Sequence, residues 1–222
     1  FRNALTPRMG PVHLNLPRDV LAAQFENSFD LHPSSYRDMS TPAGDFEKIK
    51  QASRIISEAN KPVIIAGGGI KNTAGQTQAL ALAEELNCPI VTSPGHGDAI
   101  AFSHPLNAGQ MGPRGNIVAS RLVKEADVIL ALGTRLGFNS TFYSYDNINR
   151  DAKIIHVEIE PSAIGRFFPI EVGIWGDAPT IAKQLLNSLK LSSNRKLADK
   201  WTSQFQVERK RYLQKNIICL IN

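Results

Sequence analysis

The sequence predicts an open, doubly wound α/β fold: a mostly parallel sheet of about six strands with helices on both faces. Two observations support this. Short unbroken apolar runs at residues 63–66 and 128–132 are typical of strands that are covered on both faces. Segments of helical period separate such runs, and strand–helix alternation implies parallel strands joined by right-handed crossovers. The 222 residues, 42% of them hydrophobic, suffice for one core of ordinary size and short pieces of neighbouring domains.

The first helix and strand follow one another directly. Residues 45–60 carry apolar side chains at three- and four-residue steps, the stripe of an amphipathic helix, and Lys61-Pro62 ends it. Residues 63–66 then form the first core strand, which stops at the glycines 67–69.

The same alternation continues to about Leu189. It predicts strands at residues 89–92, 127–132, 153–158 and 172–175, and helices at residues 73–87, 116–125 and 177–189. Asp177 and Pro179 suit the head of the last helix. The result is a Rossmann-like central unit over residues 44–190.

The chain before this unit has a different character. Residues 11–17 alternate apolar and polar side chains and end at Pro17, which predicts a short strand closing a preceding unit within residues 1–22. Residues 23–43 lack any sustained period and are predicted to be a linker.

The chain after the central unit is predicted to be a linker helix over residues 191–222. Charged and amide residues dominate it, with Leu197, Trp201, Phe205 and Tyr212 at rough helical spacing. The ending IICLIN is apolar and has no explanation in this scheme.

Composition excludes several classes of function. The net charge of +5 is spread along the chain among acidic neighbours, so no nucleic-acid partner is expected. The apolar runs are far shorter than the roughly 20 residues of a membrane span. The two cysteines, Cys88 and Cys219, have no CxxC spacing, which argues against a zinc site or a disulfide framework and favours a cytoplasmic location. The chain opens at Phe1 without the pattern of a secretion signal, so we expect neither a native start nor a leader.

The candidate binding residues gather at the carboxyl ends of the predicted strands. Ligands of open parallel sheets bind there, and glycine lets a phosphate or a ring approach the backbone. Glu158 or Glu160 is placed to accept ribose hydroxyls. Tight turns without a ligand are the alternative, because the GGG sequence lacks the GxGxxG spacing. The glycines concerned are Gly67, Gly68, Gly69, Gly95, Gly97, Gly133 and Gly176.

Two arginines could meet a phosphate at this edge. Arg135 follows Gly133-Thr134 directly, and Arg114 lies in the QMGPRG turn, although either could be an ordinary surface residue. Neither a metal triad nor a catalytic group is predicted. The histidines His96, His104 and His156 are dispersed, and Ser93 and Ser103 lack an elbow motif.

An ordered series of motifs resembles the acetolactate synthase and sulfoacetaldehyde acetyltransferase family of thiamine-diphosphate-dependent enzymes, which also includes glyoxylate carboligase. GPVHLNLPRDV resembles the end of the family's pyrimidine-binding domain, and KPVIIAGGGI the start of its central, DHS-like domain. HPLNAGQMGPRGN, ADVILALGTRL, IIHVEIEPSAIGR and GIWGDA follow in the family's order. The stretches HGDAIAFSHPL and GTRLGFNSTF are more similar to sulfoacetaldehyde acetyltransferase than to acetolactate synthase.

The resemblance implies a fragment of a carboligase or acyltransferase that acts on a small 2-oxo acid such as pyruvate, or on sulfoacetaldehyde. The parent would be a homo-oligomer, a dimer or a tetramer. Its catalytic glutamate and its Mg²⁺ and thiamine-diphosphate ligands would lie outside this chain, so the fragment itself is expected to be inactive. Family members carry FAD across the central domain. The corresponding positions are Gly67, Gly68, Gly69, Arg114, Gly115, Gly133, Arg135, Glu158 and Asp177.

Leu136, Gly137 and Phe138 replace an acidic pair that is usual in acetolactate synthases, which leaves FAD, ADP or an empty site open. A structural or regulatory module that binds FAD or ADP is one alternative function. An NAD-dependent deacylase or an electron-transfer flavoprotein-like domain is another, although two cysteines cannot form the zinc site usual in such deacylases.

Overall fold

The computed structural model describes residues 1–222 except 7, 25–31, 39, 72, 192–197 and 222, and side chains are described for all of these but residues 73 and 216–221. The chain forms two compact units, Phe1–Thr41 and Pro42–Asn222, and each is described here by itself. The candidate residues all belong to the second unit.

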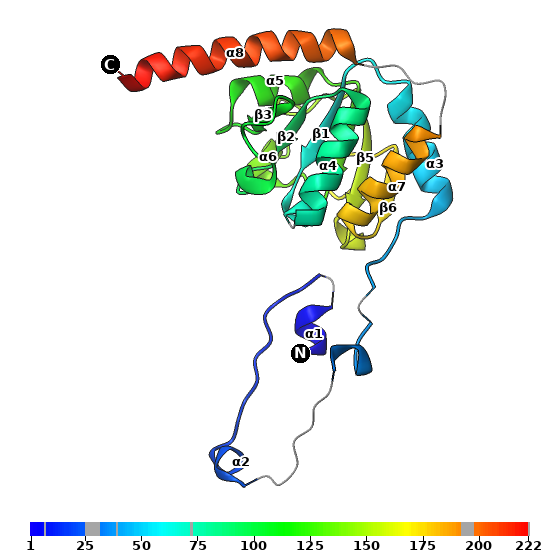
Figure 1. Ribbon diagram of the computed structural model, residues 1–222, viewed down its shortest axis with the longest axis vertical. Helices are drawn as coiled ribbons and strands as arrows, with labels where there is room; N and C mark the ends of the chain where they lie inside the picture. The colour runs from blue at the N-terminus through cyan, green and yellow to red at the C-terminus, as the bar shows by residue number, and fades with distance from the viewer. Residues whose placement is uncertain (7, 25–31, 39, 72, 192–197, 222) are drawn as a thin grey trace. The chain divides into compact units, whose positions relative to one another are not determined.

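The second unit is built on a six-stranded sheet in the order β3-β2-β1-β4-β5-β6, with every neighbouring pair parallel (Figure 1). The predicted fold class is therefore confirmed. The chain moves outward from β1 to β3 and then returns to β4 beside β1, so the order reverses between β1 and β4. The strands are β1 Pro62–Ala66, β2 Ile90–Thr92, β3 Asn107–Gln110, β4 Val128–Leu132, β5 Lys153–Glu158 and β6 Val172–Trp175.

The helices begin where the sequence supplies caps. Asp45 accepts a hydrogen bond from Lys48 N at 3.0 Å, and Asn116 accepts one from Val118 N at 2.8 Å, which satisfies free N–H groups of the first turn. The helices are α3 Phe46–Ser57, α4 Thr73–Leu86, α5 Ile117–Glu125, α6 Phe138–Thr141, α7 Ala178–Lys190 and α8 Asp199–Ile221, with short 3-10 turns η2 Gly68–Ile70, η3 Gly97–Ala99 and η4 Pro161–Ala163.

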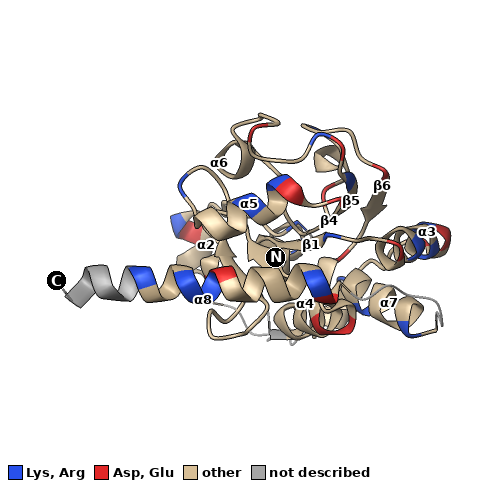
Figure 2. Cartoon of the chain, turned by 90° about the horizontal axis from the view of Figure 1, so that it is seen from above, with Lys and Arg blue, Asp and Glu red and all other residues tan. Residues whose placement is uncertain are grey.

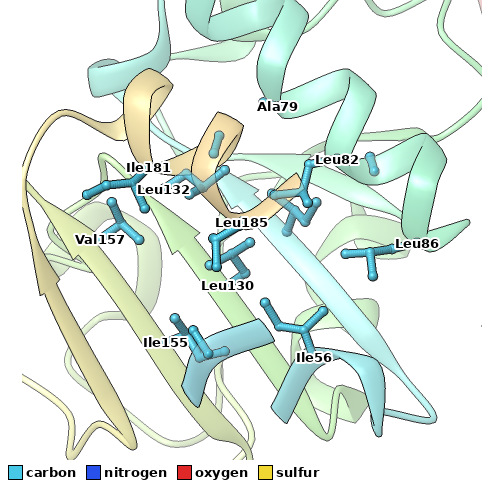
Figure 3. Close-up of a cluster of buried hydrophobic side chains, with 14 of the residues drawn as sticks. Ile56, Ala79, Leu82, Leu86, Leu130, Leu132, Ile155, Val157, Ile181 and Leu185 are labelled. Carbon is cyan, nitrogen blue, oxygen red and sulfur yellow. The ribbon is translucent and has the colours of Figure 1, made fainter. Parts of the chain in front are cut away.

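One face of the sheet is covered by α3, α4 and α7. Figure 3 shows Leu130, Leu132 and Ile155 of the sheet meeting side chains from these helices, among them Leu82 and Leu185. Burial of a side chain of this kind stabilises the fold by about 1.5–3 kcal/mol. This helical layer holds the strands in place, and the candidate residues lie at the ends of those strands.

The other face is covered by α5 and α8. Val63 and Ile65 point to this side, whereas Ile64 points to the first, because successive strand residues alternate. From α8, Phe205 is 1% exposed and packs into this core. Burial on both faces is the reason that β1 is an unbroken apolar run.

The helix α8 packs on the rest of the second unit. Trp201 Nε1 donates to Pro62 O at 3.2 Å, and Arg209 donates to Asn107 O at 2.8 Å and to Phe102 O at 2.6 Å. The predicted helical character of this segment is confirmed. Its role as a connection to another domain stays a prediction, and Leu197 and the IICLIN ending lie outside the residues whose side chains are described.

The strand β3 was not predicted. Its sequence NAGQ has no β-branched or aromatic residue, and a side-chain network defines it instead. Asn107 Nδ2 donates to Ile100 O at 3.0 Å, and Asn107 Oδ1 accepts from Gly109 N at 2.8 Å.

The first unit contains the short helices α1 Arg2–Leu5 and α2 Arg18–Ala22 and the 3-10 turn η1 Pro33–Ser35. Arg2 Nε donates to Tyr36 O at 2.9 Å. The predicted strand at residues 11–17 is wrong for this chain: these residues form no strand and are exposed. A strand needs a hydrogen-bonding neighbour, and none of the described residues supplies one.

Charged residues of both signs are interspersed on the helices. Figure 2 shows Lys or Arg and Asp or Glu together on α3, α5 and α8. Of the helices that the structure describes, none has both the length and the apolar character that a membrane span requires.

Candidate functional site

The carboxyl edge of the sheet is held together by backbone hydrogen bonds between successive turns. The first residue after a strand donates its N–H to a carbonyl at the end of the neighbouring strand, which is the last residue of that strand in every case but Val157, the penultimate residue of β5. These bonds are Met111 N to Thr92 O (2.9 Å), Ser93 N to Ala66 O (2.9 Å), Gly67 N to Leu132 O (2.9 Å), Gly133 N to Val157 O (2.9 Å) and Gly176 N to Glu158 O (3.1 Å).

Three of the predicted glycines form a close contact where the strand order reverses. A Cβ on Gly67 would lie 2.2 Å from Gly133 O, and a Cβ on Gly69 would lie 2.8 Å from Gly133 Cα. Gly69 N also donates to Gly133 O at 3.0 Å. We call Gly67, Gly69 and Gly133 the glycine seam. Its glycines are required by backbone packing, and the N–H groups of all three are already bonded within the protein.

The turn after β2 is different, because its glycines face open space. A Cβ on Gly95 would meet nothing within 4 Å, and one on Gly97 would meet only Gln110 Oε1 at 3.9 Å. The His96 ring between them covers Gly68, where a Cβ would lie 2.8 Å from His96 Cε1.

Three buried polar atoms beside this turn have no hydrogen-bond partner among the described residues. They are Thr92 Oγ1, Ser93 Oγ and His96 Nδ1. Thr92 is 1% exposed and Ser93 is 3% exposed. A buried polar group without a partner costs about 1–3 kcal/mol, so these three atoms mark a place where water or polar atoms of a ligand would complete the bonding.

The two predicted arginines are available for a ligand. Arg114 and Arg135 are exposed, and neither has a hydrogen bond or an ion pair with any described residue. Gly115, beside Arg114, is required by the tight turn after β3, since a Cβ there would lie 2.3 Å from Gln110 O.

The predicted acidic residues form hydrogen bonds with residues close to them in the sequence. Asp177 caps α7 by accepting from Thr180 N at 3.0 Å and Thr180 Oγ1 at 2.6 Å. Glu160 caps η4 through Ser162. Glu158 is buried, and its Oε1 accepts from Ile159 N at 3.0 Å, which leaves its second oxygen without a described partner. Glu158 differs from the other two in that it caps no helix or 3-10 turn and is buried.

The other histidines lie in separate structural settings. His156 is 2% exposed, its Nε2 donates to Thr134 O at 2.8 Å, and its Nδ1 accepts from Gly165 N at 3.2 Å. Burial lowers the pKa of His156 below its ordinary 6.5, which favours the neutral form of the ring in the folded protein. His104 pairs with Glu84 at 3.1 Å. No three His, Cys, Asp or Glu side chains within the described part of the chain are grouped as a metal site would need.

Two cavities lie away from this edge. One of about 940 Å³ is lined by residues of α3 and α7, and one of about 520 Å³ is lined by residues of α5 and α8. Neither contains a predicted site residue. We place the candidate site at the carboxyl edge on its unsatisfied polar atoms rather than on cavity size, because ligands of such sheets bind where the strands end.

Comparison with known proteins identifies the family of this chain. Residues 49–185 match the family model described as the central domain of thiamine pyrophosphate enzymes. The chain belongs to this family. The match runs from within α3 to within α7 and includes every predicted site residue.

Relatives of thiamine pyrophosphate enzymes are similar over most of this chain. A sulfoacetaldehyde acetyltransferase of Roseovarius nubinhibens is 39% identical over 181 residues, which are 81% of this chain and 29% of the relative. A probable acetolactate synthase large subunit of Methanococcus aeolicus is 34% identical over 200 residues, 88% of this chain and 33% of the relative. The acetolactate synthase large subunit of Corynebacterium glutamicum is 35% identical over 86% of this chain and 30% of its own length.

The chain thus spans about a third of the length of the curated relatives it matches. The family match confirms the resemblance predicted from the motifs. It decides for thiamine pyrophosphate enzymes over an NAD-dependent deacylase or an electron-transfer flavoprotein.

Proposed function

We propose that this chain is the central domain of a thiamine-diphosphate-dependent transferase or lyase of the acetolactate synthase or sulfoacetaldehyde acetyltransferase type, and that this domain is itself non-catalytic. The family match and the names of the relatives support the proposal. The whole enzyme would be a cytoplasmic homo-oligomer, a dimer or a tetramer, acting on pyruvate or sulfoacetaldehyde.

The coenzyme would be held elsewhere in the enzyme. The described residues offer no grouped set of metal ligands for Mg²⁺, so we assign no step of the coenzyme's chemistry to this chain. Residues 1–22 would complete the pyrimidine-binding domain. The alternating exposed side chains of Val12 (53%), Leu14 (68%) and Leu16 (55%) support this, since they suit a strand that packs on a partner sheet.

The test of the whole enzyme uses the full reading frame that encodes this chain. The purified protein, supplied with thiamine diphosphate and Mg²⁺, is assayed with pyruvate and with sulfoacetaldehyde plus phosphate. Turnover of one of them supports the proposal, and turnover of neither contradicts both assignments.

For the chain itself, we propose that the carboxyl edge binds an adenine nucleotide, FAD or ADP, in a structural or regulatory role. The carrying observation is the cluster of unpartnered buried atoms, Thr92 Oγ1, Ser93 Oγ and His96 Nδ1. Arg114 and Arg135 would meet phosphate, and the second oxygen of Glu158 would meet ribose. The glycine seam would lie beneath the ligand as a support rather than as its hydrogen-bond donor.

Calorimetric titration of the chain with FAD and with ADP tests this site. Ser93→Ala is expected to lower the affinity by roughly fivefold, about 1 kcal/mol, while the unliganded stability stays the same or rises because an unsatisfied hydroxyl is removed. Ser53→Ala is the matched control, since Ser53 Oγ on α3 is also buried without a partner but lies away from the carboxyl edge. Absence of binding by the wild-type chain would indicate a vestigial site.

A further inference from the structure

The chain enters the second unit through a short segment that α7 and the turn before it hold in place. The division between the two units falls between Thr41 and Pro42. Residues 42–44 follow this division directly and precede α3, and we call them the entry segment. Figure 1 shows α3, α7 and β6 side by side at this end of the sheet.

The side chain of Gln184 on α7 binds both backbone groups of Gly44. Gly44 N donates to Gln184 Oε1 at 2.8 Å, and Gln184 Nε2 donates to Gly44 O at 3.1 Å. A primary amide carries a donor and an acceptor side by side, so Gln184 pairs with Gly44 as the backbone of a neighbouring strand would. The two residues are 140 positions apart in the sequence, so this pair ties the start of the unit to α7.

The turn between β6 and α7 binds the other end of the entry segment. Asp177 N donates to Pro42 O at 2.8 Å. Gly176 has a φ of +150°, and a Cβ there would lie 2.8 Å from Pro42 O, so the close approach of the entry segment requires glycine. Asp177 therefore has two structural roles, because its carboxylate also caps α7.

Gly44 also lies directly on the hydrophobic core. A Cβ at this position would lie 2.8 Å from Ile174 Cγ2 of β6. It would also lie 3.1 Å from Ile181 Cγ1 of α7 and 3.2 Å from Ile49 Cδ1 of α3. The entry segment is thus seated where these three elements meet.

This arrangement accounts for the sequence GIWGDA by contacts within the protein. The N–H groups of Gly176 and Asp177 are both bonded, to Glu158 O at 3.1 Å and to Pro42 O at 2.8 Å. The conformation of Gly176 and the position of Asp177 follow from the entry segment and from α7. No ligand is needed to explain why this glycine and this acid stand at the end of β6.

We propose that Gly176, Asp177 and Gln184 form an entry clamp that fixes residues 42–44 on the central domain, and that Gln184 is a positioning residue for the whole enzyme. The second part rests on the function proposed above, in which residues 1–22 complete the pyrimidine-binding domain. With the entry segment fixed, the connection to that domain leaves the central domain from one defined point. Gln184 acts through the backbone of Gly44 and contacts no substrate.

Amide hydrogen exchange of this chain, followed by NMR, tests the clamp. Gln184→Met keeps the length of the side chain but removes its donor and its acceptor. We expect the Gly44 amide to exchange about 5- to 150-fold faster in this variant, which corresponds to the loss of two hydrogen bonds, while the amides of β1 exchange as in the wild type. Exchange at Gly44 that Gln184→Met leaves unchanged overturns the clamp.

Two further variants sharpen this comparison. Gln51→Met is the matched control, because Gln51 is exposed on α3 and forms no hydrogen bond with a described residue. It should leave the exchange of Gly44 unchanged. Gln184→Glu keeps an acceptor for Gly44 N and loses the donor to Gly44 O, so it should give an intermediate rate. It also tests the clamp if Gln184→Met fails to fold.

The positioning role is tested in the full reading frame, with thiamine diphosphate, Mg²⁺ and each of pyruvate and sulfoacetaldehyde plus phosphate. We expect Gln184→Met to lower kcat by up to about 100-fold, because a unit that is placed less precisely misaligns the reacting groups. Gln184→Glu should restore part of this loss, in the same order as the protection of Gly44, and Gln51→Met should restate the wild-type kcat.

The two measurements separate the possible failures. Faster exchange at Gly44 together with a wild-type kcat in Gln184→Met overturns the positioning role and supports the clamp. A wild-type enzyme that turns over neither substrate overturns the proposed function and the positioning role with it. In that case the exchange rates of Gly44 still decide the clamp.

Discussion

Glycines at strand ends have two distinct roles in this domain. The glycine seam is required because the turns after β1 and β4 pack backbone on backbone, while Gly95 and Gly97 face open space. The sequence has glycines at both kinds of position, but it does not show which role each one has. The distinction depends on contacts between turns that are far apart in the chain.

A pair of alanine substitutions separates the two roles. Gly67→Ala is expected to lower the free energy of unfolding by at least about 1–3 kcal/mol, since its Cβ would clash with the carbonyl oxygen of Gly133. Gly97→Ala, with nothing closer than 3.9 Å, is expected to leave stability unchanged or slightly raised. Urea denaturation measures both, and equal losses would contradict the seam.

His156 is expected to make folding sensitive to acid. Burial lowers its pKa below the ordinary 6.5, so below that pH the unfolded chain binds a proton that the folded chain does not. Stability is therefore complete above about pH 6.5 and falls as the pH drops toward the folded-state pKa, by at most about 1.4 kcal/mol per pH unit for this one group. Urea midpoints of wild type and His156→Gln across this range test the prediction: the variant's curve should be flatter, and parallel curves would contradict it.

Among the candidate site residues, the sequence predicts those whose side-chain chemistry by itself suggests a ligand. Arg114 and Arg135 were expected at the carboxyl edge and lie there unpaired. Thr92 was missed, and Ser93 and His96 were noted but given no binding role. Their only signal is the absence of a partner after folding, which no local pattern encodes.

At the scale of elements, α8 shows what helical spacing can and cannot predict. The apolar positions predict a helix, but they do not tell which surface it covers. In the structure, Phe205 and Trp201 complete the core over the second face of the sheet.

Two substitutions on α8 test this packing. Phe205→Ala is expected to cost about 3–5 kcal/mol, because a fully buried ring leaves a cavity. Val207→Ala, at a position 51% exposed two residues further on, should stay within about 0.5 kcal/mol of wild type. Chemical denaturation followed by tryptophan fluorescence gives both values, and a small loss for Phe205→Ala would mean that α8 is not part of the folded core.

Strands were predictable where hydrophobicity defines them. The strand β5 occupies the predicted residues 153–158, because a run buried on both faces is conspicuous in sequence. The edge strand β3 was missed because Asn107 bonds with the preceding loop define it, and residues 11–17 have the pattern of a strand but no neighbouring strand.

For the whole molecule, the two units are expected to differ in resistance to proteases. Residues 8–24 are exposed throughout and include Arg8 and Arg18. Brief trypsin treatment should cut after these arginines before any site within residues 42–190, where most trypsin sites lie in packed secondary structure. Mass spectrometry of the products identifies the order, and early cuts within α3 or α7 would contradict it.

The global architecture was the most predictable level. The alternation of apolar strands and amphipathic helices limits the chain to very few topologies, and the observed order β3-β2-β1-β4-β5-β6 is among them.

The glycine seam also bears on how relatives of this domain should be interpreted. Because Gly67, Gly69 and Gly133 are needed to close the protein backbone on itself, a homologue that had lost its nucleotide long ago would still be selected to keep them. Retention of these glycines is therefore a record of folding constraint. If the proposed nucleotide site is correct, a survey for its loss should compare the residues equivalent to Ser93 and Arg135, whose side chains form no hydrogen bond with a described residue.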